Sequence, residues 1–246
     1  EKAGKNQEKQ GGERTKPTPR VNKSAIRKKM AAQLEGLELL QKILQGIIQS
    51  GLGALNPKTL NMLEGQAKQL GNYYLTYPQI VLRDFIYLFK NTSDPEPAYS
   101  IAIDRLTRLY SLAKKGREYL CKRMADSELT PETNSAIEEM LGHTWQLAEL
   151  KDLGLVQSDA ELIQLQFYSW YSQARNEYID AGAWLNLKTG QIHKTLAYRP
   201  VKAAKHIRED DSVFDLVRIP ELFTYPSGDI NIRVRWEAFT LREMTE

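Results

Sequence analysis

The stretch YPSGDINIRVRWEAFTLREMTE, residues 225–246, decides the fold class of this chain. Within it, Ile230, Ile232, Val234 and Trp236 alternate with polar residues. Successive side chains of a strand point to opposite faces, so this spacing predicts a strand with an apolar inner face. Most of the preceding residues repeat with a helical period instead, and a strand here therefore indicates a mixed fold.

The composition is typical of a globular protein. Of the 246 residues, 41% are hydrophobic, which is enough for a substantial core. No apolar run approaches the roughly 20 residues that a membrane helix needs, and residues 1–20 contain no apolar segment typical of a secretory signal. Cys121 is the single cysteine, so an internal disulfide is excluded. We expect a cytoplasmic protein that does not enter a membrane.

Positive charge is concentrated at the start of the chain. Residues 1–30 contain ten Lys or Arg and three Glu, whereas the whole chain carries a net charge of only +3. Residues 1–21 have almost nothing apolar to bury, so we interpret them as a disordered basic linker. Such a tail is also able to hold phosphates loosely, but it contains no aromatic residue on which a base would stack.

Helical periodicity predicts about six helices between residues 22 and 181. The first is expected to bury Ile26, Met30, Leu34, Leu37, Leu44 and Ile48. Two more follow at 58–73 and after Pro78. The helix that starts at Asp94 and Pro95 is expected to bury Tyr99, Ile103, Leu106, Tyr110 and Ala113. Another start signal is the pair Thr130 and Pro131.

The most aromatic segment is LIQLQFYSWYSQARNEY, residues 162–178, and a capping-box spacing of Ser158 and Glu161 precedes it. Its helical spacing places six residues on one face, namely Ile163, Phe167, Trp170, Tyr171, Ala174 and Tyr178. Such a stripe suits a stacking platform or a partner groove, but aromatic residues are more often buried in a core, which we favour. Tyr168 lies off the stripe and is a candidate for an outward contact.

Beyond residue 181 the period changes from helical to two. Residues 184–200 form a predicted hairpin around Gly190, with Leu185 and Leu187 facing inward, and a further strand ends at Pro220. We therefore predict an α+β fold with a basic linker (1–21), a predominantly α-helical domain (22–181) and a small antiparallel β-rich subdomain (182–246).

No residue pattern identifies a catalytic, cofactor or metal site. GxGxxG, P-loop and GxSxG motifs are absent from the sequence. His193, His206 and the acidic run 209–211 are close in sequence, but they lack the fixed short spacing of zinc ligands. We expect no enzyme activity, no cofactor and no metal in this chain.

The segment WLNLKTGQIHKTLAYRPVKAAKHIREDDSVFDLVRIPELFTYPSGDINIRVRWE, residues 184–237, resembles the region C-terminal to the zinc finger in bacterial SWIM zinc-finger proteins. The matching features are the W-x-x-x-x-T-G hairpin, YRPxKAxKHIxxxDSVF, PELFxYP and RVRWE. The family's Cys-x-Cys and Cys-x-His ligands have no counterpart here, so zinc is expected only in a finger upstream, and the start at Glu1 favours a fragment. The resemblance implies a supporting role beside MoxR-type ATPases and von Willebrand A-domain proteins.

Two classes of function follow. The first is an interaction module that binds a protein partner, and the alternative is a nucleic-acid-binding accessory module. The candidate contacts for either are Arg27, Lys28, Lys29, Tyr168, Lys202, Lys205, Arg233 and Arg235. Residues 182–246 contain ten basic and nine acidic groups. This balance is unlike a phosphate-binding surface and favours the protein partner.

Overall fold

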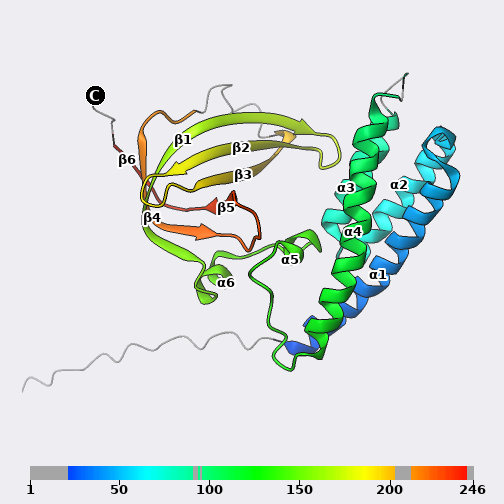
Figure 1. Ribbon diagram of the computed structural model, residues 1–246, viewed down its shortest axis with the longest axis horizontal. Coiled ribbons are helices and arrows are strands. Elements are labelled where there is room, and N and C mark those ends of the chain that lie inside the picture. Colours follow the sequence, from blue (N-terminus) through cyan, green and yellow to red (C-terminus); the bar gives the residue numbers. More distant parts are fainter. Residues whose placement is uncertain (1–21, 91–93, 95, 203–211, 243–246) are drawn as a thin grey trace, which may run out of the picture.

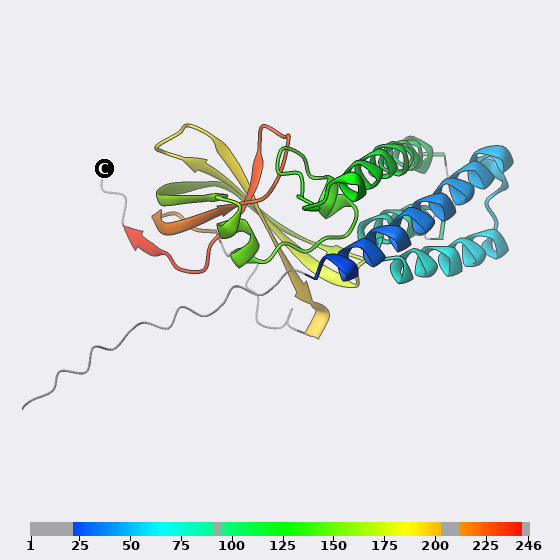
Figure 2. The ribbon, with the colours of Figure 1, turned by 90° about the horizontal axis from the view of Figure 1, so that it is seen from below.

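The computed structural model describes residues 22–90, 94, 96–202 and 212–242. It confirms the α+β class: a helical bundle comes first in the chain, and a β-sheet follows it. The bundle and the sheet lie at opposite ends of the molecule, with one short helix between them and a second short helix beside the sheet (Figures 1 and 2). The predicted linker, residues 1–21, lies outside the described part of the chain.

Four long helices make up the bundle. They are α1 (Lys23–Ser50), α2 (Pro57–Asn72), α3 (Thr76–Lys90) and α4 (Ala98–Ala125), with the short 3₁₀ helix η1 (Leu52–Ala54) after the first. Asn22 and Asn56 cap α1 and α2, because their side chains accept hydrogen bonds from backbone N–H groups three residues on. Helix α1 packs against α4, α2 against α3, and α3 against α4. None of the described helices has the length and apolar content to cross a lipid bilayer.

The buried faces of α1 and α4 differ from the predicted ones. Ile48, Ile103 and Tyr110 were expected in the core, but each is at least half exposed. Helix α4 instead buries Ala102 and Gly116. A Cβ atom on Gly116 would lie 2.9 Å from Leu141 and 3.2 Å from Leu37. Because the small residues Ala102 and Gly116 allow other segments to approach α4 closely, the buried face of α4 is displaced by about one residue from the predicted stripe of large side chains.

The connector between bundle and sheet contains α5 (Ile137–Met140) and α6 (Leu147–Asp152). The helix predicted from Thr130 is therefore reduced to a single short turn. Glu138 is buried and accepts hydrogen bonds from Tyr119 and Arg123 on α4. Burial raises the pKa of Tyr119, and the hydrogen bond to Glu138 raises it further. This cluster fixes the connector to the bundle, because a buried carboxylate requires its donors.

The sheet is a closed barrel with one additional edge strand. Its strands are β1 (Val156–Ser172), β2 (Glu177–Asn186), β3 (Ile192–Pro200), β4 (Leu216–Thr224), β5 (Ile232–Arg235) and β6 (Thr240–Arg242). Residues 162–172 of β1 pair with β2, and residues 156–162 pair with β4. The order β1-β2-β3-β5-β4 thus returns to β1, while β6 pairs with β4 alone among the described strands. Only the β3–β5 pairing in this part of the chain is parallel.

The helix predicted across residues 158–178 is wrong, because this segment forms β1, a turn and the start of β2. Trp170 and Tyr171, which were expected in the core, are exposed. A β-bulge between Gln164 and Gln166 changes which side chains point inward, so β1 does not keep a strict two-residue period. The predicted domain boundary at residue 181 consequently falls inside β2.

The predicted hairpin around Gly190 is confirmed, and that glycine has the positive φ of 69° that its turn requires. Its inner face is shifted by one residue. Trp184 and Asn186 are buried, whereas Leu187 is exposed. A one-residue error in phase exchanges the two faces of a strand.

Candidate functional site

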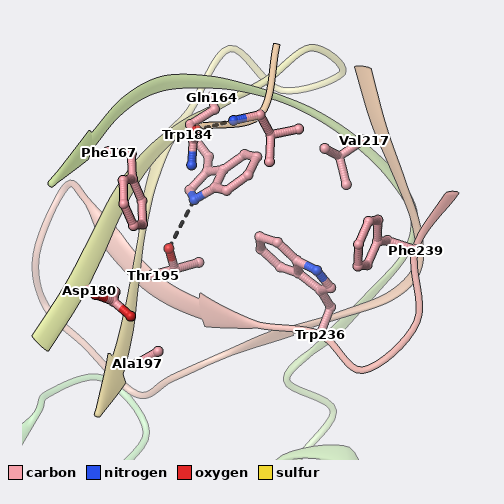
Figure 3. Close-up of a pocket in the computed structure, with 10 residues that line it drawn as sticks. Gln164, Phe167, Asp180, Trp184, Thr195, Ala197, Val217, Trp236 and Phe239 are labelled. Carbon is pink, nitrogen blue, oxygen red and sulfur yellow. Dashed lines mark hydrogen bonds between the residues drawn. The ribbon is translucent and has the colours of Figure 1, made fainter. Parts of the chain in front are cut away.

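A cavity of about 250 Å³ lies inside the barrel, near the end where the β1–β2 hairpin continues beyond it. Figure 3 shows the side chains around it. They come from β1 to β4 and from the segments before β4 and after β5, and they are Gln164, Phe167, Asp180, Trp184, Thr195, Ala197, Val213, Val217, Trp236 and Phe239. Ala197 and Phe239 are the exposed residues of this lining, so the entrance lies beside them. We refer to this cavity as the barrel pocket.

Two tryptophans form one wall of the barrel pocket. Trp184 and Trp236 meet edge to face, with ring centroids 5.2 Å apart and planes at 90°. The indole Nε1 of Trp184 donates a hydrogen bond of 2.9 Å to the Thr195 hydroxyl (Figure 3). A Cβ atom on Gly182 would lie 2.5 Å from that nitrogen. Glycine at position 182 therefore leaves the space that the indole occupies.

A charged pair borders the barrel pocket. Asp180 on β2 forms an ion pair with Arg199 on β3, and their side chains are only 13% and 19% exposed. Arg199 also donates a hydrogen bond of 3.4 Å to the hydroxyl of Ser169. Its Nη1 is buried and has no hydrogen-bond partner among the described residues. The pocket is thus largely aromatic but contains a carboxylate with a fixed orientation.

At the other end of the barrel, His193 and Asn186 are buried side by side, with 3.5 Å between Nε2 and Nδ2. Burial lowers the pKa of His193 below its ordinary value. Within the described residues, no group of three or more His, Cys, Asp or Glu is arranged to hold a metal ion. His206 and the acidic run 209–211, considered with His193 from the sequence, lie outside these residues.

The outer face of the β1–β3 sheet carries an exposed aromatic patch, which we define as Tyr168, Trp170, Tyr198 and Arg175. Tyr168 and Trp170 stack with centroids 5.1 Å apart, and they are 49% and 39% exposed. The register aligns Trp170 with Ile179 and Ile179 with Tyr198, so these three share one face. The guanidinium carbon of Arg175 lies 4.4 Å from the Tyr198 ring centroid, a cation–π distance.

The bundle has an apolar groove of its own, with a volume of about 350 Å³ between α1 and α4. Its lining consists of Ile48, Ile103, Leu106, Thr107 and Tyr110. Four of these, all except Thr107, are residues that the sequence placed in the core. The groove therefore exists because α4 buries a different face and leaves these apolar side chains at the surface.

The basic residues predicted at the start of α1 have different environments. Arg27 donates hydrogen bonds to the backbone oxygens of Met124, at 2.7 Å, and Asp126, at 3.4 Å. These bonds satisfy carbonyl groups at the end of α4, so Arg27 has a structural role. Lys28 is exposed and Lys29 is half-buried.

The two arginines of β5, Arg233 and Arg235, were expected to be exposed to solvent on one face of the strand. Only Arg235 is exposed. Arg233 is 17% exposed on its side chain, pairs with Glu139 on α5, and lies 4.2 Å from the Tyr225 ring centroid. The expectation of an inward Ile230 is also wrong, because this residue precedes β5 and is 93% exposed.

The remaining candidate contact residues do not come together on one surface of the described structure. Tyr168 belongs to the aromatic patch and is 49% exposed, although it lies on a strand and not on the predicted helix. Lys202 is exposed after β3, and Lys205 lies outside the described residues. Sequence reasoning missed Asp180 and Arg199. For Asp180, the sequence feature that could have identified it is the two-residue alternation of EYIDAGAW, residues 177–184. This alternation indicates a strand with Asp180 and Trp184 on one face.

Comparison of the chain with family models, curated proteins and solved structures finds no match. The barrel pocket and the aromatic patch are therefore assigned from geometry and chemistry alone.

Proposed function

We propose that this chain is a non-catalytic protein-interaction module that binds its partner through the aromatic patch. The observation that carries the proposal is the exposure of Tyr168 and Trp170, stacked on each other, beside Tyr198 and Arg175. Tyr, Trp and Arg are the residue types that dominate binding energy at protein interfaces. Single exposed apolar residues are ordinary, but three aromatic residues and an arginine on one face are a recognised interface composition.

The charge of the barrel favours a protein as the partner. Residues 156–202 and 212–242 contain nine basic and eight acidic side chains. Several of these are paired with each other, such as Arg218 with Glu161 and Lys194 with Asp229. A surface that binds nucleic acid usually has a clear excess of basic groups. A balanced surface with exposed aromatic side chains is better suited to a protein.

The resemblance of residues 184–237 to SWIM zinc-finger proteins supports a more specific form of the proposed protein-interaction function. We propose that the chain is a region C-terminal to the zinc finger of a bacterial protein of that family. On this proposal it acts in the cytoplasm, and its partner is a MoxR-type ATPase or a von Willebrand A-domain protein. Zinc would then belong to the upstream finger, since no ligand position of that motif is present in this chain.

A second candidate function is binding of single-stranded nucleic acid, and the strand arrangement favours it. A five-stranded barrel closed by a first strand that pairs with both β2 and β4 has the arrangement of the OB fold, which binds oligonucleotides on its β2–β3 side. Aromatic side chains in such barrels stack on bases, and arginine adds a cation–π contribution. Arg175 with Tyr198, and the exposed Lys202 and Arg235, would supply these contacts.

One set of titrations tests both candidates. The purified chain is titrated by calorimetry with a MoxR-type ATPase and with a von Willebrand A-domain protein from the same genome. A labelled single-stranded oligonucleotide is titrated at physiological salt. The test variant is the double substitution Tyr168→Ala with Trp170→Ala. Its control is Leu187→Ala with Ile192→Ala, which also removes two exposed apolar side chains but lies near the Gly190 turn.

We expect one of the two proteins to bind, and the patch variant to weaken binding about tenfold or more, since central interface residues contribute most of the affinity. The control variant should bind like the unmodified chain. Oligonucleotide binding that disappears with the patch variant would instead support the second candidate. Binding to neither protein nor oligonucleotide would contradict the proposed function.

A further inference from the structure

The barrel pocket has the size and lining of a ligand site, and it does not coincide with the aromatic patch. An apolar cavity of about 150 Å³ is large enough to bind benzene. The barrel pocket, at about 250 Å³, has room for a ring system somewhat larger than one benzene ring. Two of its lining residues, Ala197 and Phe239, are exposed, so a ligand can reach it from the solvent without unfolding the barrel.

The walls select a planar ligand. Phe167, Trp184, Trp236 and Phe239 supply aromatic surfaces around the cavity (Figure 3). Aromatic rings prefer offset-stacked or edge-to-face contacts, as Trp184 and Trp236 already show. A flat aromatic group would extend this arrangement, whereas a bulky aliphatic group would leave part of each ring surface without contact.

The polar groups select a ligand that donates a hydrogen bond. Asp180 lines the pocket, and its carboxylate has about four acceptor positions, of which the ion pair with Arg199 occupies only part. The Thr195 hydroxyl accepts the Trp184 Nε1–H, and its own O–H remains able to donate. A carboxylate in an apolar wall discriminates strongly for an N–H group, because such bonds are charge-assisted.

We propose that the barrel pocket binds a planar aromatic group of one or two rings that carries an N–H donor, with Asp180 as the acceptor. Indole is the simplest group of this chemistry. It can come from a tryptophan side chain of another protein or from a free heterocycle. The proposal is independent of the interaction function, since none of the residues of the aromatic patch lines the barrel pocket.

The test follows the four tryptophan indole N–H signals of the ¹⁵N-labelled chain by NMR. They are assigned by single Trp→Phe substitutions. Indole is added, and benzofuran, which has the same shape but no N–H group, is added in a parallel titration. We expect indole to shift the signals of Trp184 and Trp236 saturably and to leave Trp145 and Trp170 unchanged. Benzofuran should bind about tenfold or more weakly, because it makes no hydrogen bond to the carboxylate.

Two substitutions assign the effect to the pocket. Ala197→Phe places a ring at the entrance, and Ala197 is exposed, so the fold should tolerate it. This variant should lose indole binding, whereas the control Ala31→Phe, on the exposed side of α1, should keep it. Asp180→Asn keeps the shape of the side chain and should reduce the preference for indole over benzofuran. If Asp180→Asn does not fold, the Ala197 pair still decides the question.

A parallel titration with N-acetyltryptophanamide distinguishes the two sources. Binding comparable to that of indole supports a tryptophan side chain of another protein as the ligand. Binding of indole alone supports a free heterocycle. The proposal is overturned if no signal saturates up to the solubility limit of indole, if Ala197→Phe binds like the control, or if the shifts are confined to Trp170.

Discussion

Arg233 and Glu139 form an ion pair between β5 and α5, and this pair joins the barrel to the connector. The side chain of Arg233 is only 17% exposed, and it also lies against the ring of Tyr225. The alternation in residues 230–237 predicts an outward arginine at both 233 and 235. The alternation within the strand carries no information about α5, the helix that covers Arg233.

This difference leads to a test on β5. Arg233→Gln should lower the free energy of unfolding by about 1–3 kcal/mol, since it leaves a partly buried carboxylate without its partner. Arg235→Gln is the control and should change it by less than about 0.5 kcal/mol, as is usual for an exposed side chain. Urea unfolding followed by circular dichroism measures both. Equal effects of the two substitutions would contradict a structural role for Arg233.

Trp236 should contribute strongly to the stability of the barrel. It is half-buried and packs against Trp184, so Trp236→Ala should cost about 2–4 kcal/mol through lost packing and a residual cavity. Trp170→Ala removes an equally large but more exposed side chain and should cost about 1 kcal/mol or less. Thermal unfolding of the two variants provides the comparison. A more damaging Trp170→Ala would mean that the aromatic patch is part of the core.

The position of His193 predicts a pH dependence of stability. Burial lowers its pKa in the folded chain, while the unfolded chain titrates near the ordinary value of about 6.5. The unfolded state therefore binds more protons, and stability is lost as the pH falls through 6.5 towards the folded-state pKa. We expect the free energy of unfolding to decrease between pH 7.5 and 5.5. His193→Gln should remove most of this slope, and an unchanged slope in that variant would refute the assignment.

The face that α4 buries can be tested with a matched pair of residues. Leu109 is fully buried and Ile103 is 57% exposed, although the apolar spacing places Ile103 in the core. Leu109→Ala should cost about 2–5 kcal/mol, and Ile103→Ala less than about 1 kcal/mol. Chemical denaturation of both variants measures the difference. Similar losses would show that the stripe containing Ile103 is buried after all.

The sequence by itself determined those elements whose signals are local. The helix predicted at residues 58–73 is α2 (Pro57–Asn72), because a helical period repeats between residues three and four apart. The alternation of Ile232, Val234 and Trp236 gives β5 and its inner face, and Gly190 gives the β2–β3 turn. Each of these is an interaction between residues close in the chain, so the pattern contains the information.

Only the tertiary structure decided the elements that depend on distant partners. Phe167, Trp170, Tyr171 and Tyr178 fit a helical spacing as well as a bulged strand. The strand forms because β1 pairs with β2 along one part and with β4 along another. The pairing of β2 with β3 brings Asp180 to Arg199, and closure of the barrel brings Trp184 to Trp236. Hydrogen bonds and packing across long sequence separations produce these contacts, and a period counted along one segment cannot contain them.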